Sequence, residues 1–112
     1  MKPGDIVLIR FPQTDLKSGK LRPALIVANS PGGYKDLVLV LISSRLYQTI
    51  PDFDNIINSS DSDYAISGLK TSSVFRLSRI TSVDPSVINA RLGEISPERL
   101  HQIRNRIVQW FQ

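Results

Sequence analysis

The sequence predicts a mainly β (α+β) fold: a small, strongly bent antiparallel barrel of five to seven strands with a C-terminal helix. Short apolar runs rich in Val, Ile and Leu alternate with turn residues along most of the chain. Helical apolar periodicity is clear near the end of the chain. A length of 112 residues suits one hydrophobic core and is too short for two, so residues 1–112 are expected to form a single domain.

The first half of the chain contains three strongly apolar strand candidates, at residues 6–11, 20–29 and 37–42. Pro12 ends the first candidate, and the series Asn29-Ser30-Pro31-Gly32-Gly33 closes the second. Runs that are apolar at nearly every position are typical of strands buried on both faces. We therefore expect the second and third candidates to lie at the centre of the sheet.

The second half of the chain contains shorter strand candidates at residues 52–58, 71–77, 80–83 and 87–92. Residues 46–48 are expected to form one helical turn, and the polar segment 59–63 is expected to be a surface loop. Asp61 and Asp63 resemble part of a calcium loop, but no EF-hand pattern follows them, so we reject that interpretation.

The series Ser96-Pro97-Glu98 predicts the start of the C-terminal helix. Serine suits the N-cap, proline the first helical position, and glutamate the positive end of the helix dipole. An apolar face follows, made of Leu100, Ile103, Ile107 and Trp110, with Val108 and Phe111 beside it. This face is expected to pack on the sheet or on a partner, and for Trp110 and Phe111 we favour the core over an interface.

Composition excludes several classes of protein. The chain has no cysteine and one histidine, His101, so a cysteine-ligated metal or a multi-histidine site within one chain is excluded. No apolar run approaches the ~20 residues of a membrane span, and the N-terminus lacks a signal-peptide pattern. We expect a cytoplasmic protein that has no cofactor, no metal and no membrane association.

The net charge of +4 is unevenly distributed. Residues 1–45 carry +4, residues 46–70 carry −3, and residues 71–112 carry +3. Two basic segments around an acidic one favour a polyanionic partner, and nucleic acid first. A basic balance that only maintains solubility is the alternative.

Candidate anion-binding residues cluster at the ends of the apolar strands. Arg22, just before Pro23, lies where a strand emerges from a loop, so its guanidinium can face a ligand; a solvated arginine is the alternative. Ser43, Ser44 and Arg45 follow the third strand and resemble a phosphate-binding arrangement, although serines are also ordinary turn formers.

The first loop adds two further candidates. Lys17 and Lys20 belong to a polar loop that could fold over an anionic ligand next to Arg22. A mobile, solvated hairpin tip is the alternative for this segment.

Five stretches in order resemble the MazF/PemK-type toxins of bacterial toxin–antitoxin pairs. They are GDIVLIRFP (residues 4–12), LRPALIV (21–27), LISS (41–44), GLKTSSVFR (68–76) and LGEISPE (92–98). The resemblance implies an SH3-like barrel, a homodimer, and a metal-independent endoribonuclease that cleaves single-stranded RNA at short sequences and so inhibits translation and growth. It also implies a cognate antitoxin whose flexible segment blocks the active groove, and DNA binding together with that antitoxin.

Carried over by position, Arg22 matches the family's catalytic arginine, and Ser43 matches a position that is usually threonine. Arg76 matches a second arginine found in some members, which gives it an expected role in RNA binding with Lys17, Lys20, Ser44 and Arg45. Two departures matter: Ser78 stands where some relatives have aspartate, and the first loop lacks the histidine that some relatives carry there.

The expected chemistry is attack of an RNA 2′-hydroxyl on the adjacent phosphorus, which leaves a cyclic phosphate and a 5′-hydroxyl. A preorganised arginine and a hydroxyl can stabilise the charge that gathers on the phosphate oxygens. No general base is evident in the sequence, and such a base commonly contributes ~10²–10⁴-fold.

Two other functions remain open at this level. The same barrel occurs in toxins that bind and poison DNA gyrase without cutting RNA. A non-catalytic RNA-binding barrel is the third alternative, and the missing general base is consistent with it.

Overall fold

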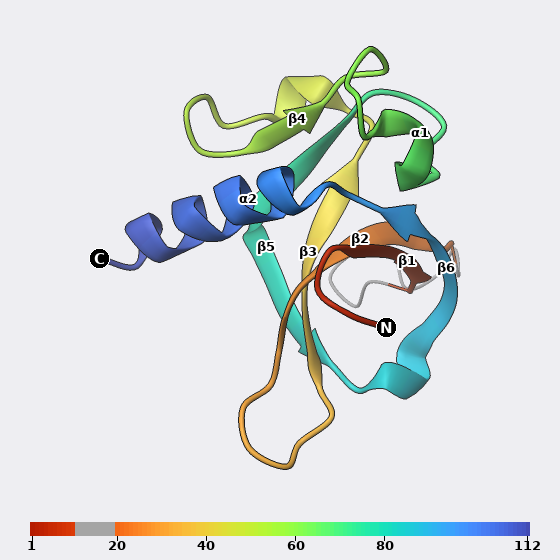
Figure 1. Cartoon of the computed structure of the whole chain (residues 1–112), viewed down its shortest axis with the longest axis vertical. Coiled ribbons are helices and arrows are strands. Elements are labelled where there is room, and N and C mark those ends of the chain that lie inside the picture. The colour runs from red at the N-terminus through yellow and green to blue at the C-terminus, as the bar shows by residue number, and fades with distance from the viewer. Residues whose placement is uncertain (11–19) are drawn as a thin grey trace.

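The computed structural model describes residues 1–10 and 20–112 as one antiparallel sheet with helices packed on its outside (Figure 1). The strands are β1 (Asp5–Ile9), β2 (Arg22–Asn29), β3 (Leu37–Ser43), β4 (Asn55–Ile57), β5 (Ser73–Val83) and β6 (Ile88–Glu94). The helical elements are η1 (Leu46–Gln48), α1 (Tyr64–Ser67), η2 (Pro85–Val87) and α2 (Pro97–Trp110). The predicted mainly β fold with a C-terminal helix is confirmed.

The sheet has the strand order β4-β5-β3-β2-β1-β6, and every neighbouring pair is antiparallel. The six strands lie within the expected range of five to seven. They bend around a common interior (Figure 1). Between the end strands β4 and β6 the hydrogen-bonded ladder stays open in the part of the chain that the structure describes.

The central strands are buried on both faces, as their continuous apolar runs predict. On one face, Leu25 and Val27 belong to a cluster that also holds Ile103 of α2. On the other face, Ala24 and Ile26 pack with residues of β1 and β3. Alternate side chains of β2 therefore enter two different clusters, which fixes the strand firmly at the point where Arg22 begins it.

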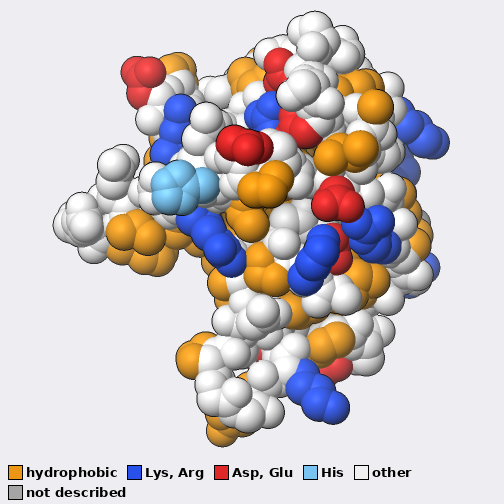
Figure 2. Space-filling model, in the orientation of Figure 1, with side chains coloured by type: hydrophobic (Ala, Val, Ile, Leu, Met, Phe, Trp, Pro, Cys, Tyr) orange, Lys and Arg blue, Asp and Glu red, His pale blue; other side chains and the backbone are white. Residues whose placement is uncertain are grey.

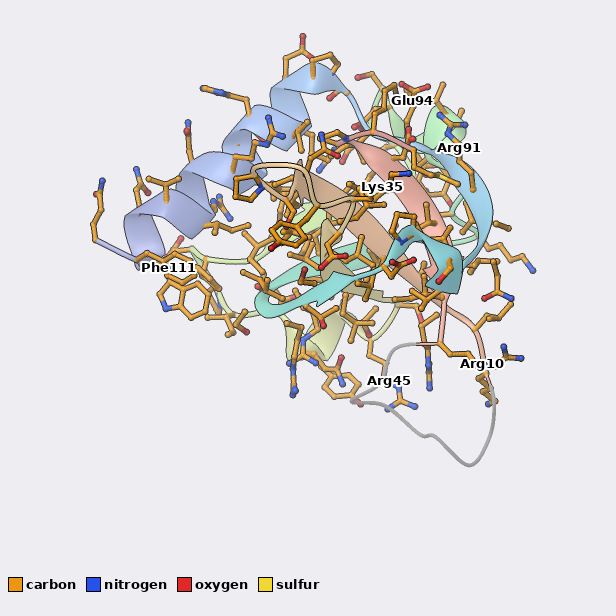
Figure 3. The ribbon with its side chains drawn as sticks, turned by 90° about the horizontal axis from the view of Figure 1, so that it is seen from below. Arg10, Lys35, Arg45, Arg91, Glu94 and Phe111 are labelled. Atoms are coloured by element: carbon orange, nitrogen blue, oxygen red, sulfur yellow. The ribbon has the colours of Figure 1, made fainter. Side chains whose placement is uncertain are left out.

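Helix α2 begins where the sequence predicts. The Ser96 hydroxyl oxygen accepts a hydrogen bond from the Arg99 backbone N–H at 3.2 Å, and Pro97 occupies the first helical turn. The preferred core placement of the two terminal aromatic residues is wrong, because Trp110 is 47% exposed and Phe111 70% exposed. The helix runs past the strands, and Phe111 lies at its far end (Figures 1 and 3).

The polar segment 59–63 forms the expected surface loop, with Ser59, Ser60 and Ser62 exposed, but its last residue differs. Asp63 is buried because the Arg99 guanidinium of α2 donates two hydrogen bonds to its carboxylate, at 2.9 and 3.0 Å. The short helix α1 follows at once and was not predicted from the sequence.

Strand β5 joins two predicted strands, 71–77 and 80–83, into one strand with an irregularity in its middle. No helix in residues 1–10 and 20–112 combines the length and the apolar character that crossing a bilayer would need.

Candidate functional site

An open groove of about 550 Å³ lies where β2 begins and β3 ends. We name it the cationic groove. Its polar lining comes from the start of β2, the end of β3 with the turn and η1 that follow, the segment after α1, and β5: Arg22, Ser43, Ser44, Arg45, Gln48, Lys70, Thr71, Ser73, Arg76 and Arg79. The remaining lining is apolar or glycine: Leu8, Pro23, Leu41, Ile42, Gly68, Leu69 and Leu92.

Sheet register explains why Arg22 and Ser43 share this groove. Ala24 of β2 pairs with Leu41 of β3, and continuing that antiparallel register puts Arg22 opposite Ser43. Facing residues of neighbouring strands project to the same face of a sheet. Two residues separated by more than twenty positions in the sequence therefore face one ligand position.

Arg76 reaches the same face from the other side of β3. It pairs with Leu41, and Ser43 pairs with Val74, so Arg76 is the diagonal neighbour of Ser43. Diagonal neighbours lie within reach of long side chains such as arginine. The hydroxyl of Ser43 thus has a guanidinium on each neighbouring strand.

The Ser43 hydroxyl is oriented by the turn that follows β3. Its oxygen accepts a hydrogen bond from the Arg45 backbone N–H at 3.1 Å. A hydroxyl that accepts in this way keeps its own proton for donation. Ser43 can therefore donate to an anion in the groove while its oxygen is held by the backbone.

Arg76 has an unsatisfied donor. Its Nε is buried and makes no hydrogen bond within the described residues. Buried polar atoms without a partner are rare, because each costs roughly 1–3 kcal/mol. An anionic ligand oxygen in the groove would supply the missing acceptor.

All the charged side chains that line the groove in the described structure are positive. Arg22, Arg45, Lys70, Arg76 and Arg79 line it, and none of the lining residues that the structure describes is Asp, Glu or His. The face that carries α2 is different, because acidic and basic side chains are interspersed there (Figure 2). A phosphate group is therefore attracted to the groove more strongly than to that face.

The residues named from the sequence fall into three groups. The structure brings Arg22, Ser43, Ser44, Arg45 and Arg76 together in the groove. Lys20 is described but is not part of the groove lining, and Lys17 lies outside the described residues.

Sequence reasoning missed Arg79 and Lys70. Simple alternation along a strand puts Arg76 and Arg79 on opposite faces, so no periodic signal links them. A bulge in β5 changes this, because Leu41 pairs with Arg76 while the adjacent Val40 pairs with Ile80. The extra residues 77–79 bend the strand and bring both arginines to the groove.

Lys70 reaches the groove through a tight contact between α1 and β6. Helix α1 ends at Gly68, whose φ of +73° a residue with a side chain rarely adopts. A Cβ on Gly68 would lie 2.2 Å from the Leu92 carbonyl oxygen, and one on Gly93 would lie 2.2 Å from the Ile66 carbonyl oxygen. Both glycines let the chain turn back so that residues 68–71 form one wall of the groove.

The described residues offer no group of three or more His, Cys, Asp or Glu side chains that could hold a metal ion. Ser78, which stands where some relatives have aspartate, is exposed and outside the groove lining. The chemistry available in the described groove is therefore hydrogen-bond donation and positive charge.

Comparison with known proteins agrees with this architecture. The chain is similar to a solved structure described as an endoribonuclease in complex with its cognate antitoxin from Mycobacterial species, with a TM-score of 0.66 and 21% sequence identity. The similarity covers 97% of this chain and 92% of that chain, and at this identity it shows a shared fold. A search of curated proteins finds no match.

A family model described as the PemK-like, MazF-like toxin of type II toxin–antitoxin systems matches residues 2–111. Because this match covers nearly the whole chain, the protein belongs to the PemK-like, MazF-like family of type II toxins.

Proposed function

We propose that this toxin is a sequence-specific, metal-independent endoribonuclease that cleaves single-stranded RNA, including mRNA, and so inhibits translation and growth. The observation that carries the proposal is the cationic groove, where Arg22, Ser43 and Arg76 lie on neighbouring strands. Family membership and the endoribonuclease with the same fold support it.

In the proposed reaction the 2′-hydroxyl of the RNA attacks the adjacent phosphorus and the 5′-oxygen leaves. The products are a 2′,3′-cyclic phosphate and a 5′-hydroxyl. Negative charge grows on the non-bridging oxygens during this step, and Arg22 is the group that we assign to bind them. Its guanidinium can make two parallel bonds to a phosphate.

Ser43 and Arg76 complete the assignment. The Ser43 hydroxyl donates to one phosphate oxygen, and the buried Nε of Arg76 donates to a second. Ser44 and Arg45 hold the neighbouring backbone of the RNA, and Lys17 and Lys20 are proposed to bind RNA as well. Arg79 and Lys70 add charge along the groove.

We further propose that RNA cleavage by this toxin is slow and needs no metal ion bound to the protein. The described groove lining contains no carboxylate or imidazole to act as a base or to bind a divalent cation. General acid–base catalysis commonly contributes ~10²–10⁴-fold, so a site that lacks it turns over slowly.

The proposed partners follow from the same groove. A cognate antitoxin with a flexible anionic segment would compete with RNA for the cationic groove and neutralise the toxin in the cytoplasm. We also propose that the toxin is a homodimer and that the complex with antitoxin binds DNA.

The experiment that tests the proposal is incubation of a long single-stranded RNA with the purified toxin in chelator, followed by mapping of the new 5′ and 3′ ends. We expect cuts at one short sequence, with 5′-hydroxyl and cyclic-phosphate ends. Arg22→Ala should lower the cleavage rate by ~10²–10³-fold, because one preorganised donor at the developing charge is lost.

Arg22→Lys is the matched control, since it keeps the charge but not the two-pronged geometry, and it should retain only part of the activity. Equal cutting by wild type and Arg22→Ala would contradict the catalytic assignment. Salt-sensitive binding of RNA that remains intact would instead support the non-catalytic barrel. Recovery of gyrase from a pull-down, again with intact RNA, would support the gyrase-binding alternative.

A further inference from the structure

A buried carboxylate outside the groove is bonded to the strand that carries Arg76. Asp54 is 5% exposed and directly precedes β4. Its Oδ1 accepts a hydrogen bond from the Leu77 backbone N–H at 2.9 Å, and its Oδ2 accepts one from the Ile50 backbone N–H at 2.9 Å. The carboxylate thus bonds to main chain on two separate segments.

Leu77 lies in β5 between the end of the β4–β5 pairing and the bulge. On one side, the β4–β5 pairing ends with Asn55 opposite Phe75. On the other side, the bulge begins, since Arg76 still pairs with Leu41 but the next pair along β3 is Val40 with Ile80. Continuing the β4–β5 register would place Phe53 opposite Leu77, two residues beyond Asn55, and the Asp54 carboxylate supplies the acceptor that a longer β4 would otherwise provide.

The segment around Asp54 is itself anchored to α2. The Arg106 Nη1 donates to the backbone carbonyl oxygens of Phe53, at 3.0 Å, and of Asp54. The backbone that carries Asp54 is therefore held by α2, and the Asp54 carboxylate bonds to Leu77 at the start of the bulge. A fixed acceptor restricts the Leu77 amide to one position.

The side chain of Arg76 depends on this backbone. Its Nε is buried within the described residues without a hydrogen-bond partner, so no bond at that atom holds the guanidinium in place. The main chain at residues 76 and 77 sets the point and the direction from which the Arg76 side chain enters the groove. The hydrogen bonds of the Asp54 carboxylate go to the backbone N–H groups of Ile50 and Leu77, and among the described residues it forms no ion pair with Arg76.

We propose that Asp54 is a positioning residue: its bond to the Leu77 amide holds the β5 bulge that presents Arg76 to the groove. This role concerns the same groove as the proposed nuclease function, and the tests that measure RNA cleavage rest on that function. Asp54 touches no substrate and acts only through Arg76.

The test uses the full-length toxin with Asp54→Ala, Asp54→Asn and a matched control, Asp5→Asn. Asp5 is also a buried carboxylate, 2% exposed, and accepts the Lys2 backbone N–H at 2.9 Å, but it is not part of the groove lining. The first readout is hydrogen exchange of the Leu77 amide and the position of the Arg76 Nε–H resonance. We expect both to change in Asp54→Ala and to stay at wild-type values in Asp5→Asn.

The second readout is a double-mutant cycle on single-turnover RNA cleavage. Asp54→Ala should slow cleavage by roughly 10-fold in the wild-type background and by less than about 2-fold in the Arg76→Ala background, because a residue that acts through Arg76 has nothing to act on once it is gone. Equal losses in both backgrounds would show a general structural effect and overturn the proposal. An unchanged Arg76 resonance in folded Asp54→Ala would overturn it as well.

Asp54→Asn keeps an acceptor for Leu77 and loses the charge. It should keep the protection of the Leu77 amide and cleave within a few-fold of wild type. If Asp54→Ala does not fold, Asp54→Asn is the variant that tests whether Asp54 positions Arg76. Loss of cleavage with the Leu77 amide still protected would assign the effect to charge and contradict the positioning role.

Failure of the proposed function has a different signature. If the wild-type toxin does not cut RNA, titration with a 2′-deoxy oligonucleotide replaces the cleavage assay. The Arg76 Nε–H resonance should shift on titration in wild type and in Asp5→Asn, and should shift less in Asp54→Ala. Identical shifts in all three proteins would overturn the positioning role whatever the fate of the nuclease proposal.

Discussion

Arg99 and Arg76 are both partly buried arginines, but their surroundings are opposite. Arg99 of α2 makes five hydrogen bonds, to Asp63, Asp61, Asn55 and the carbonyl oxygen of Ile56, with distances from 2.7 to 3.0 Å. A guanidinium has five N–H donors, so this set satisfies them all. Arg76 has a buried Nε without a partner in the described structure and faces a groove lined by other cations.

The difference separates an arginine that holds the fold from one that is kept ready for a ligand. Arg99 joins α2 to β4 and to the segment before α1, which are far apart in sequence. Arg76 weakens the folded state by leaving a donor unsatisfied, and this cost is recovered only when an anion binds. Whether the guanidinium is paired is therefore the property by which we distinguish the structural arginine from the one proposed to bind RNA.

The largest expected effect is on stability at Arg99. Arg99→Met should lower the free energy of unfolding by ~3–5 kcal/mol, because the buried Asp63 carboxylate loses its partner. Urea denaturation measures the loss. RNA cleavage per folded molecule should stay at the wild-type level, and a selective loss of cleavage would break the distinction between the two arginines.

The same substitution at Arg76 should give the reverse pattern. Arg76→Met removes an unsatisfied donor, so its melting temperature should equal or exceed that of the wild type. Cleavage should fall by ~10²–10³-fold, as expected for loss of one donor at the developing charge. A destabilised protein with normal cleavage would show that Arg76 is structural.

The Arg99 network also predicts a pH dependence. The hydrogen bonds from the Arg99 guanidinium lower the pKa of Asp63 from 3.8 to about 2. Because the pKa is lower in the folded state, this stabilisation is fully present above the unfolded pKa and is lost as the pH falls from about 4 to about 2. The contribution is about 2 kcal/mol.

Urea unfolding of wild type and Asp63→Asn between pH 5 and pH 2 measures this contribution. The wild type should lose more stability over this range than the variant, since asparagine does not titrate. Parallel pH curves for the two proteins would contradict the assignment of the low pKa to Asp63.

The smallest effect is expected at the exposed end of the groove. Arg45 and Lys35 are both exposed cations, but only Arg45 lines the groove (Figure 3). Arg45→Ala should reduce the slope of log K against log salt for single-stranded RNA by ~0.7, the value for one phosphate contact. Lys35→Ala is the control and should leave the slope unchanged; equal changes would mean that binding follows total charge.

Strong local patterns predicted most of the fold. The apolar runs of β2 and β3 and the Ser96-Pro97 start of α2 were readable, because burial on both faces and helix capping each leave a short-range signature. The bulge in β5 was not readable, since it depends on how β3 and β4 pair with it. For the same reason Arg79 was missed at the groove.

Contacts between distant segments account for the other errors. The burial of the loop residue Asp63 was not readable because its partner, Arg99, lies 36 positions away. Trp110 and Phe111 continue the apolar face of α2, but whether a helix extends beyond its sheet depends on sheet width, which the helix sequence does not contain. Of the proposed groove residues, Arg22 and Ser43 were readable because each directly adjoins a strongly apolar run.

Pro23 has a consequence for the entropy cost of building the groove. A residue that precedes proline is sterically confined to extended backbone conformations, and Arg22 lies in β2 in that position. The Arg22 backbone is therefore restricted already in the unfolded chain, so that less conformational entropy is lost there when the chain folds. Substituting Pro23 would return that freedom to the unfolded chain, and folding would then have to remove it.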